Sequence, residues 1–174
     1  YSSGTEFDTL VFAYTIQNGD IASDLTYTGT TALALNGGTI KDLAGNVATL
    51  TLASPTASGS LGNAKALVVD GVLPTISTAA VTAGTKSLVI KTSEVTTNTP
   101  DKGDFAVLIG SASNAVTAVS DPSTVKVSGV DVSQYTLTLT NVIANDSTVT
   151  VGYTQNSSDS SKMKDAAGNA VATL

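Results

Sequence analysis

The residues of this sequence most suited to chemistry are aspartates in a short motif that occurs twice. Segment 41–46, Lys-Asp-Leu-Ala-Gly-Asn, returns as segment 164–169, Lys-Asp-Ala-Ala-Gly-Asn. In such a motif the glycine (Gly45 or Gly168) supplies a positive φ angle and the Asp carboxylate accepts backbone N–H bonds, which predicts a turn entering the next strand. The alternative interpretation makes Asp42 and Asp165 calcium ligands, because carboxylate and loop carbonyl oxygens are what calcium binds. One carboxylate per loop is few for a calcium site, so the turn is the favoured interpretation.

Asp70 is the stronger candidate for a cation ligand. It lies in residues 68–75, where a strand stops and Pro74 favours extended chain, the pattern of a linker. A carboxylate between two domains can meet loop oxygens from both of them and fix their angle when calcium binds. The candidate partners of Asp70 are Asp42 from the first module and Asp101, Asp104 or Asp165 from the second, according to which loops reach the junction. In the alternative interpretation Asp70 is a solvated linker residue with no ligand.

Composition removes most enzyme classes. The chain has no Cys, His or Trp, and all eight basic residues are Lys. Disulfide scaffolds, zinc sites, nucleophile–histidine pairs and arginine phosphate clamps therefore lack their residues. Glycoside hydrolysis needs two facing carboxylates and aromatic sugar platforms, and the platforms are missing. A Lys–Asn isopeptide crosslink assisted by Glu94 needs a buried acid, whereas Glu94 is expected at an exposed strand end. We predict a protein that is not an enzyme.

The net charge and the hydropathy of the chain exclude several classes of binding partner. The net charge of −6 argues against nucleic-acid backbones and anionic membranes, which bind basic patches. Apolar runs are far shorter than the ~20 residues that span a bilayer. The charged fraction of 13% is about half the usual value, and Ser and Thr fill the surface instead. Because the first residue is Tyr1 rather than Met, we expect a mature or excised segment of a longer protein.

Period-two alternation of apolar residues predicts an all-β fold. The alternating segments are 10–16, 50–52, 88–90, 105–109, 135–139 and 149–153. Turn signals rich in Asn, Gly, Asp and Pro separate them at the spacing of a sandwich of two antiparallel sheets. Tyr14 and Tyr153 each precede a Thr near the end of an alternating segment, and we predict both as core anchors.

The repeated motif indicates tandem modules. With a boundary near residue 70, residues 71–174 have the size of a complete immunoglobulin-like sandwich. Residues 1–70 contain only the later strands of such a module, so their sheets would have an open edge and a half-covered core. The early strands are then expected either from upstream residues or from another chain by donor-strand complementation.

The two halves resemble known bacterial repeats. Segments 4–20, 38–46 and 69–75 closely resemble the latter two thirds of the bacterial Ig-like repeats of giant surface adhesins. Segments 90–95, 149–154 and 164–169 resemble the SwmB-like repeats of cyanobacterial and other bacterial cell-surface proteins. The resemblance implies tandem Ig-like sandwiches, an extracellular location, neighbouring repeats or identical subunits as partners, and calcium as a cofactor.

These observations predict a structural repeat of an extracellular bacterial surface protein, such as an adhesin stalk, stiffened by calcium. The alternative is a self-assembling fibre or surface-layer subunit that uses the unfinished first module to accept a partner strand. A third interpretation is a carbohydrate- or ice-binding module with a flat face of threonines such as Thr136, Thr138 and Thr140.

Overall fold

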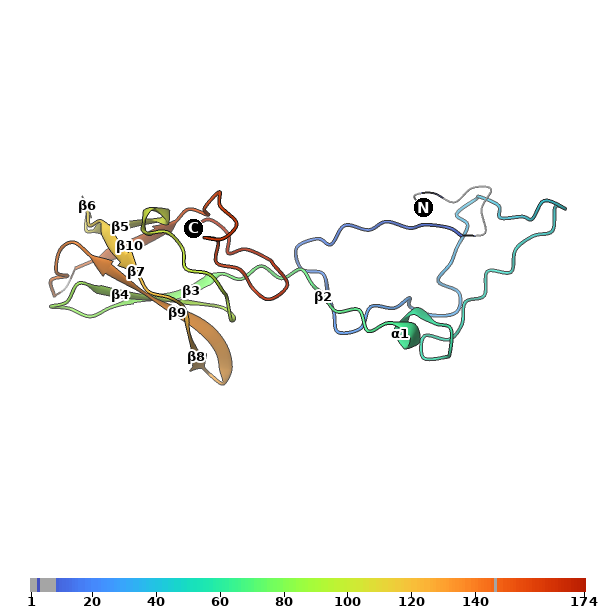
Figure 1. The fold of residues 1–174 in the computed structure, drawn as a ribbon, viewed down its shortest axis with the longest axis horizontal. Helices are drawn as coiled ribbons and strands as arrows, with labels where there is room; N and C mark the ends of the chain where they lie inside the picture. The colour runs from blue at the N-terminus through green and yellow to red at the C-terminus, as the bar shows by residue number, and fades with distance from the viewer. Residues whose placement is uncertain (1–2, 4–8, 146) are drawn as a thin grey trace. The chain divides into compact units, whose positions relative to one another are not determined.

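The computed structural model describes residue 3, residues 9–145 and residues 147–174. The chain divides into two compact units, residues 1–71 and 72–174, and each is described here by itself. The predicted all-β class is confirmed, since nearly all of the regular secondary structure of the described residues is antiparallel strand (Figure 1).

The second unit holds two antiparallel sheets. The larger sheet has the order β3 (Ile76–Val81), β4 (Ser87–Thr92), β9 (Val130–Leu139) and β7 (Val116–Val119). The first half of β9 also pairs with β8 (Ser123–Val127). The smaller sheet has the order β10 (Val149–Tyr153), β5 (Phe105–Ile109) and β6 (Ala112–Ser113), and the short 3-10 helix η1 (Lys102–Asp104) leads into β5.

The two sheets pack face to face around one core (Figure 1). β4 reads Ser-Leu-Val-Ile-Lys-Thr, and its Leu and Ile are fully buried while the residues between them are not. The same alternation on β9, β5 and β10 sends one face of each strand inward, which is why the period-two pattern yields a sandwich. The buried hydrophobic cluster is Leu88, Ile90, Phe105, Val107, Val116, Tyr135, Leu137, Leu139, Ile143, Tyr153, Met163 and Val171.

The first unit has few regular elements. They are β1 (Ile21–Ala22), which pairs antiparallel with β2 (Val69–Asp70), and α1 (Leu61–Ala64), which is capped by the Ser60 hydroxyl. Among the described residues of this unit, only Ser60 and Gly71 are buried, and neither belongs to a hydrophobic core.

Two predicted strands are therefore wrong as strands of this chain. Segments 10–16 and 50–52 alternate as expected but form no strand, apart from an isolated bridge at Val11. A strand needs a continuous hydrogen-bonded neighbour. Among the described residues these segments have only isolated backbone bonds, such as those of Val11 with Ser3 and of Leu52 with Thr30.

Candidate functional site

The repeated aspartate motif folds into the same turn in both units. The Asp42 N–H donates to the Asn46 carbonyl at 3.0 Å, and the Asp165 N–H donates to the Asn169 carbonyl at 3.0 Å. In each copy the Asn backbone N–H donates to the Asp Oδ1 at 2.8 Å. The Asn side-chain amide donates to Oδ2, at 2.7 Å in the first copy and 2.8 Å in the second. Both copies of the motif therefore form the turn that the sequence predicts.

The glycine of each motif has the backbone conformation that the sequence demanded. Gly45 has φ +89° and Gly168 has φ +95°, in the region that residues with a side chain rarely adopt. The N–H of each glycine donates to the carbonyl of the motif Asp. Both glycines are therefore turn formers.

The two turns differ in their surroundings. Asp165 is only 5% exposed, whereas Asp42 lies in solvent. The hydrogen bond from the Asn46 side chain, followed by that from its backbone N–H, lowers the pKa of Asp42. The chain that follows each turn pairs back across it, Ala48 with the Ile40 carbonyl and Val171 with the Met163 carbonyl. Only in the second unit does this hairpin contribute to a hydrophobic core.

The turn of the second unit brings Asp165 next to Glu94. Thr97 pairs with Lys164, which also pairs with Ala170, so that the segment after β4 and the motif form a small ladder. Carboxylate oxygens of Glu94 and Asp165 lie within 4.8 Å of each other. Two carboxylates at this distance repel, and a bound cation would relieve that repulsion.

A buried network of hydroxyl groups holds the Glu94 segment in place. The Thr92 hydroxyl donates to the Glu94 carbonyl at 2.6 Å. The Ser133 hydroxyl accepts from the Thr96 N–H and donates to the Thr96 carbonyl, both at 2.8 Å. The Thr96 and Tyr135 hydroxyls are 2.8 Å apart. Since the network joins β4, β9 and the loop, Glu94 is half-buried rather than at the exposed edge that the sequence suggested.

Asp101 and Asp104 serve the turn that begins β5. The Asp101 N–H donates to the Asp104 carboxylate at 3.0 Å, in a capping box around η1. The side-chain amide of Asn156 donates to both carboxylates, at 2.8 and 2.9 Å. Within the described part of the chain, Asp42, Asp101 and Asp104 belong to no group of three acidic residues close enough to share an ion.

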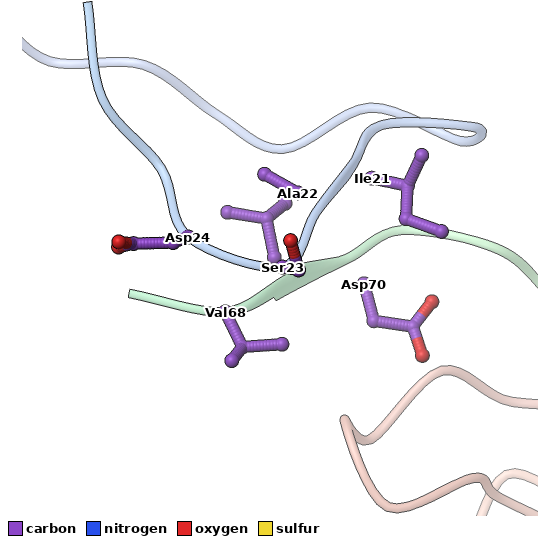
Figure 2. A pocket seen from close by; sticks show the side chains of 7 residues that line it. Ile21, Ala22, Ser23, Asp24, Val68 and Asp70 are labelled. Atoms are coloured by element: carbon purple, nitrogen blue, oxygen red, sulfur yellow. The ribbon is translucent and has the colours of Figure 1, made fainter. Parts of the chain in front are cut away.

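Asp70 is the second residue of β2 and lies opposite Ile21 of β1. The short β1–β2 ribbon borders a wide-open hollow of about 560 Å³, and Figure 2 shows the carboxylates of Asp24 and Asp70 pointing away from each other. Asp24 accepts a hydrogen bond from the Leu67 N–H at 3.3 Å. An open hollow of this kind, lined mainly by aliphatic side chains, has no convergent polar groups with which to orient a small ligand. The role of Asp70 as a linker ligand stays a prediction.

Segment 10–16 presents large apolar side chains to solvent. Phe12 is 60% exposed, Tyr14 75% and Ile16 52%. The prediction of Tyr14 as a core anchor is wrong: its hydroxyl donates to Asp20 at 2.7 Å, and this hydrogen bond raises the pKa of Tyr14. Tyr153, by contrast, is 1% exposed and packs on Phe105, with ring centroids 5.3 Å apart.

The threonines of β9 do not make a uniform polar face. Thr138 lies outward between Ser87 of β4 and Ala118 of β7, and Thr136 lies between Val89 and the Ser120 loop. Aliphatic and hydroxyl groups therefore alternate across this surface instead of repeating as a grid.

The sequence analysis missed Glu94 as a neighbour of Asp165. The two residues are far apart along the chain and share no motif, and the pairing of Thr97 with Lys164 helps to bring them together. No local pattern in the sequence signals such a contact.

Comparison of the chain with protein-family models, with curated proteins and with solved structures finds no match. Among the described residues, no helix is long and apolar enough to cross a membrane.

Proposed function

We propose that this chain is a non-enzymatic structural repeat of an extracellular bacterial surface protein, of the kind that forms an adhesin stalk. The observation that carries the proposal is the motif turn, which recurs with the same hydrogen bonds in both units. Two copies of one turn, each followed by the same return of the chain, are what tandem Ig-like modules of one ancestry would show.

The second unit has the physical properties of a mechanical element. Its core is continuous, and its final residues pair with β10 through the Leu174 N–H and the Tyr153 carbonyl at 2.8 Å. A sandwich of this kind resists extension because core packing and strand hydrogen bonds must break together. It needs no disulfide, and the chain has no cysteine.

Pulling single molecules of the full chain by its ends tests this proposal. We expect one force peak, from the second unit, with a gain in contour length of about 35 nm for about 100 residues. The first unit should lengthen without a peak because its described residues form no core. In parallel, an antibody against residues 72–174 should label intact cells of the source organism. Extension of the second unit without a force peak, or labelling only after lysis, would contradict the proposal.

Calcium stiffening is part of the same proposal. The neighbouring carboxylates of Glu94 and Asp165 support it, because an oxygen-lined acidic pair at a rigid turn suits a weak extracellular calcium site.

A second candidate function is a fibre or surface-layer subunit that self-assembles through the first unit. The exposed apolar side chains of segment 10–16 favour it. Concentration-dependent filaments of the purified chain, seen by electron microscopy, would select this candidate over the stalk repeat.

A further inference from the structure

We infer that Asn36 is a site of spontaneous modification, at which the side-chain amide is lost by deamidation and an aspartate or isoaspartate carboxylate takes its place. The inference does not depend on the proposed function. The only co-reactant that it needs is water.

The sequence contains two Asn-Gly pairs, Asn18-Gly19 and Asn36-Gly37. Asparagine is a thermolabile residue. A following glycine favours its deamidation, because the reaction begins when the backbone nitrogen of the next residue attacks the side chain, and glycine has no Cβ to hinder the approach. Both asparagines are exposed. Neither the sequence nor the exposure distinguishes the two pairs, and the difference lies in their backbone hydrogen bonds.

At the first pair the attacking nitrogen is held in a hydrogen bond. The Gly19 N–H donates to the Gly71 carbonyl at 3.0 Å, and the Gly71 N–H donates to the Asp20 carbonyl at 2.7 Å. The same turn is closed by the Asp20 N–H, which donates to the Gln17 carbonyl at 3.1 Å, and by the Gln17 N–H, which donates to the Asp20 carboxylate at 2.7 Å. Attack by the Gly19 nitrogen therefore requires several hydrogen bonds to open together.

At the second pair the attacking nitrogen is not held in this way. Asn36 has φ +46° and Gly37 has φ +87°. The Gly38 N–H donates to the Leu35 carbonyl at 2.8 Å, which completes the pattern of a type I′ turn. Within the described part of the chain, the Gly37 N–H makes no hydrogen bond. A single backbone hydrogen bond closes this turn, so the local opening that brings the Asn36 side chain to the Gly37 nitrogen costs less than the opening at Asn18.

The reaction balances with water alone. Hydroxide removes the proton of the Gly37 N–H, and the nitrogen attacks Cγ of Asn36. A bond forms between these two atoms, and the bond from Cγ to the side-chain nitrogen breaks. Ammonia leaves with a proton from water, which restores the hydroxide, and a five-membered succinimide ring remains. Water then opens the ring at either of its two carbonyl carbons, which gives aspartate or isoaspartate.

The product alters the turn in which it forms. Either product adds one negative charge to a chain whose net charge is −6. Isoaspartate also adds one carbon atom to the main chain between residues 36 and 37, so the hydrogen bond from Gly38 to Leu35 no longer closes in the same geometry. The described residues of the first unit form no hydrophobic core, and the change therefore stays local to the turn.

Incubation of the full chain in mildly alkaline buffer, with and without concentrated urea, tests the inference. Chymotrypsin cleaves after Tyr27, which places the two Asn-Gly pairs in different peptides, and mass spectrometry then follows each deamidation. In urea, where both turns are open, the two pairs should react at similar rates. In the folded chain we expect Asn36 to react about tenfold faster than Asn18, because the additional hydrogen bonds at Asn18 must open first. Both rates should rise with pH.

Matched variants separate the turn from the sequence. A Cβ at residue 71 would lie 2.4 Å from the Gln17 carbonyl oxygen. Gly71→Ala should therefore break the hydrogen bonds that hold Gly19 and speed the reaction at Asn18, without changing the rate at Asn36. Asn36→Gln should stop the reaction at residue 36, because the ring would need six members, and should leave Asn18 as it is.

Three results would overturn the inference. The same ratio of the two rates in the folded chain and in urea would show that the turns do not select the site. An Asn36 that reacts in urea but stays intact in the folded chain would show that the type I′ turn protects it. A product that fragmentation identifies as aspartate alone would show direct hydrolysis of the side chain instead of attack by the Gly37 nitrogen.

Discussion

Asp42 and Asp165 make the same hydrogen bonds, yet they differ in what depends on them. Asp165 is buried within the hairpin that carries Met163 and Val171 into the core, whereas the hairpin of Asp42 contributes no residue to the hydrophobic core of the described chain. The contribution of each Asp to the stability of its unit therefore depends on whether its turn packs against a core. The two copies thus form a natural matched pair for mutation.

Asp165→Ala should destabilise the second unit by about 1–3 kcal/mol, because the half-buried Asn169 donors lose their acceptor. Asp42→Ala should leave the melting of that unit unchanged within about 0.5 kcal/mol. Thermal unfolding of the full chain, followed by circular dichroism, measures both. Equal effects of the two substitutions would show that the motif acts in some way other than by supporting the core.

The turn of the first unit should respond to acid. Hydrogen bonds from Asn46 lower the pKa of Asp42 in the folded turn. A carboxyl whose folded pKa is depressed contributes stability above its unfolded pKa of about 3.9, and loses it as pH falls through the folded pKa. We expect the Asn46 backbone and side-chain amide resonances to move toward random-coil values only below about pH 4. In Asp42→Asn, that pH dependence should vanish; its persistence would assign it to another group.

At the scale of elements, a strand forms where its partner is present in the same unit. The alternating segments of residues 88–90, 105–109, 135–139 and 149–153 all lie in strands, as predicted. Segments 10–16 and 50–52 carry an equally clear pattern and form none. Alternation specifies which face a strand would bury, but pairing requires a neighbour, and that depends on chain outside the local pattern.

Contacts between residues far apart in the sequence could not be predicted either, because they too depend on chain outside the local pattern. The turn at Asp165 was predictable because Asp, Gly and Asn act within a few residues of each other. The proximity of Glu94 depends on the Thr97–Lys164 pairing and on a hydroxyl network anchored at Ser133. These are long-range consequences of topology, which a single sequence does not display.

The β5–β10 pair should account for much of the stability of the second unit. Phe105 is 7% exposed and packs on Tyr153, so Phe105→Ala should cost about 3–5 kcal/mol. Leu108, on the opposite face of the same strand, is 38% exposed, and Leu108→Ala should cost less than about 1 kcal/mol. Urea unfolding of the full chain gives both values. A comparable loss in the two variants would mean that the strand, rather than its inward face, determines stability.

At the scale of the whole molecule, the two units differ in self-sufficiency. The second unit buries a complete core, whereas the described residues of the first leave apolar side chains in solvent. Folding of the isolated chain should accordingly show one cooperative transition, because cooperativity follows from a shared core.

Calcium supplies the last prediction at this scale. If calcium binds Glu94 and Asp165 with a Kd typical of extracellular sites, a tenfold excess over Kd should stabilise the second unit by about 1.4 kcal/mol. Asp165→Asn should abolish the rise in melting temperature, and magnesium should be less effective because it demands a tighter octahedral shell.

The linker role that the sequence predicts for Asp70 can be tested separately from calcium binding at Glu94 and Asp165. Small-angle scattering should change with calcium in the unmodified chain but not in Asp70→Asn, whose melting should still respond. A scattering profile insensitive to calcium and chelator would remove that role from Asp70, and an unchanged melting temperature would remove calcium from the protein.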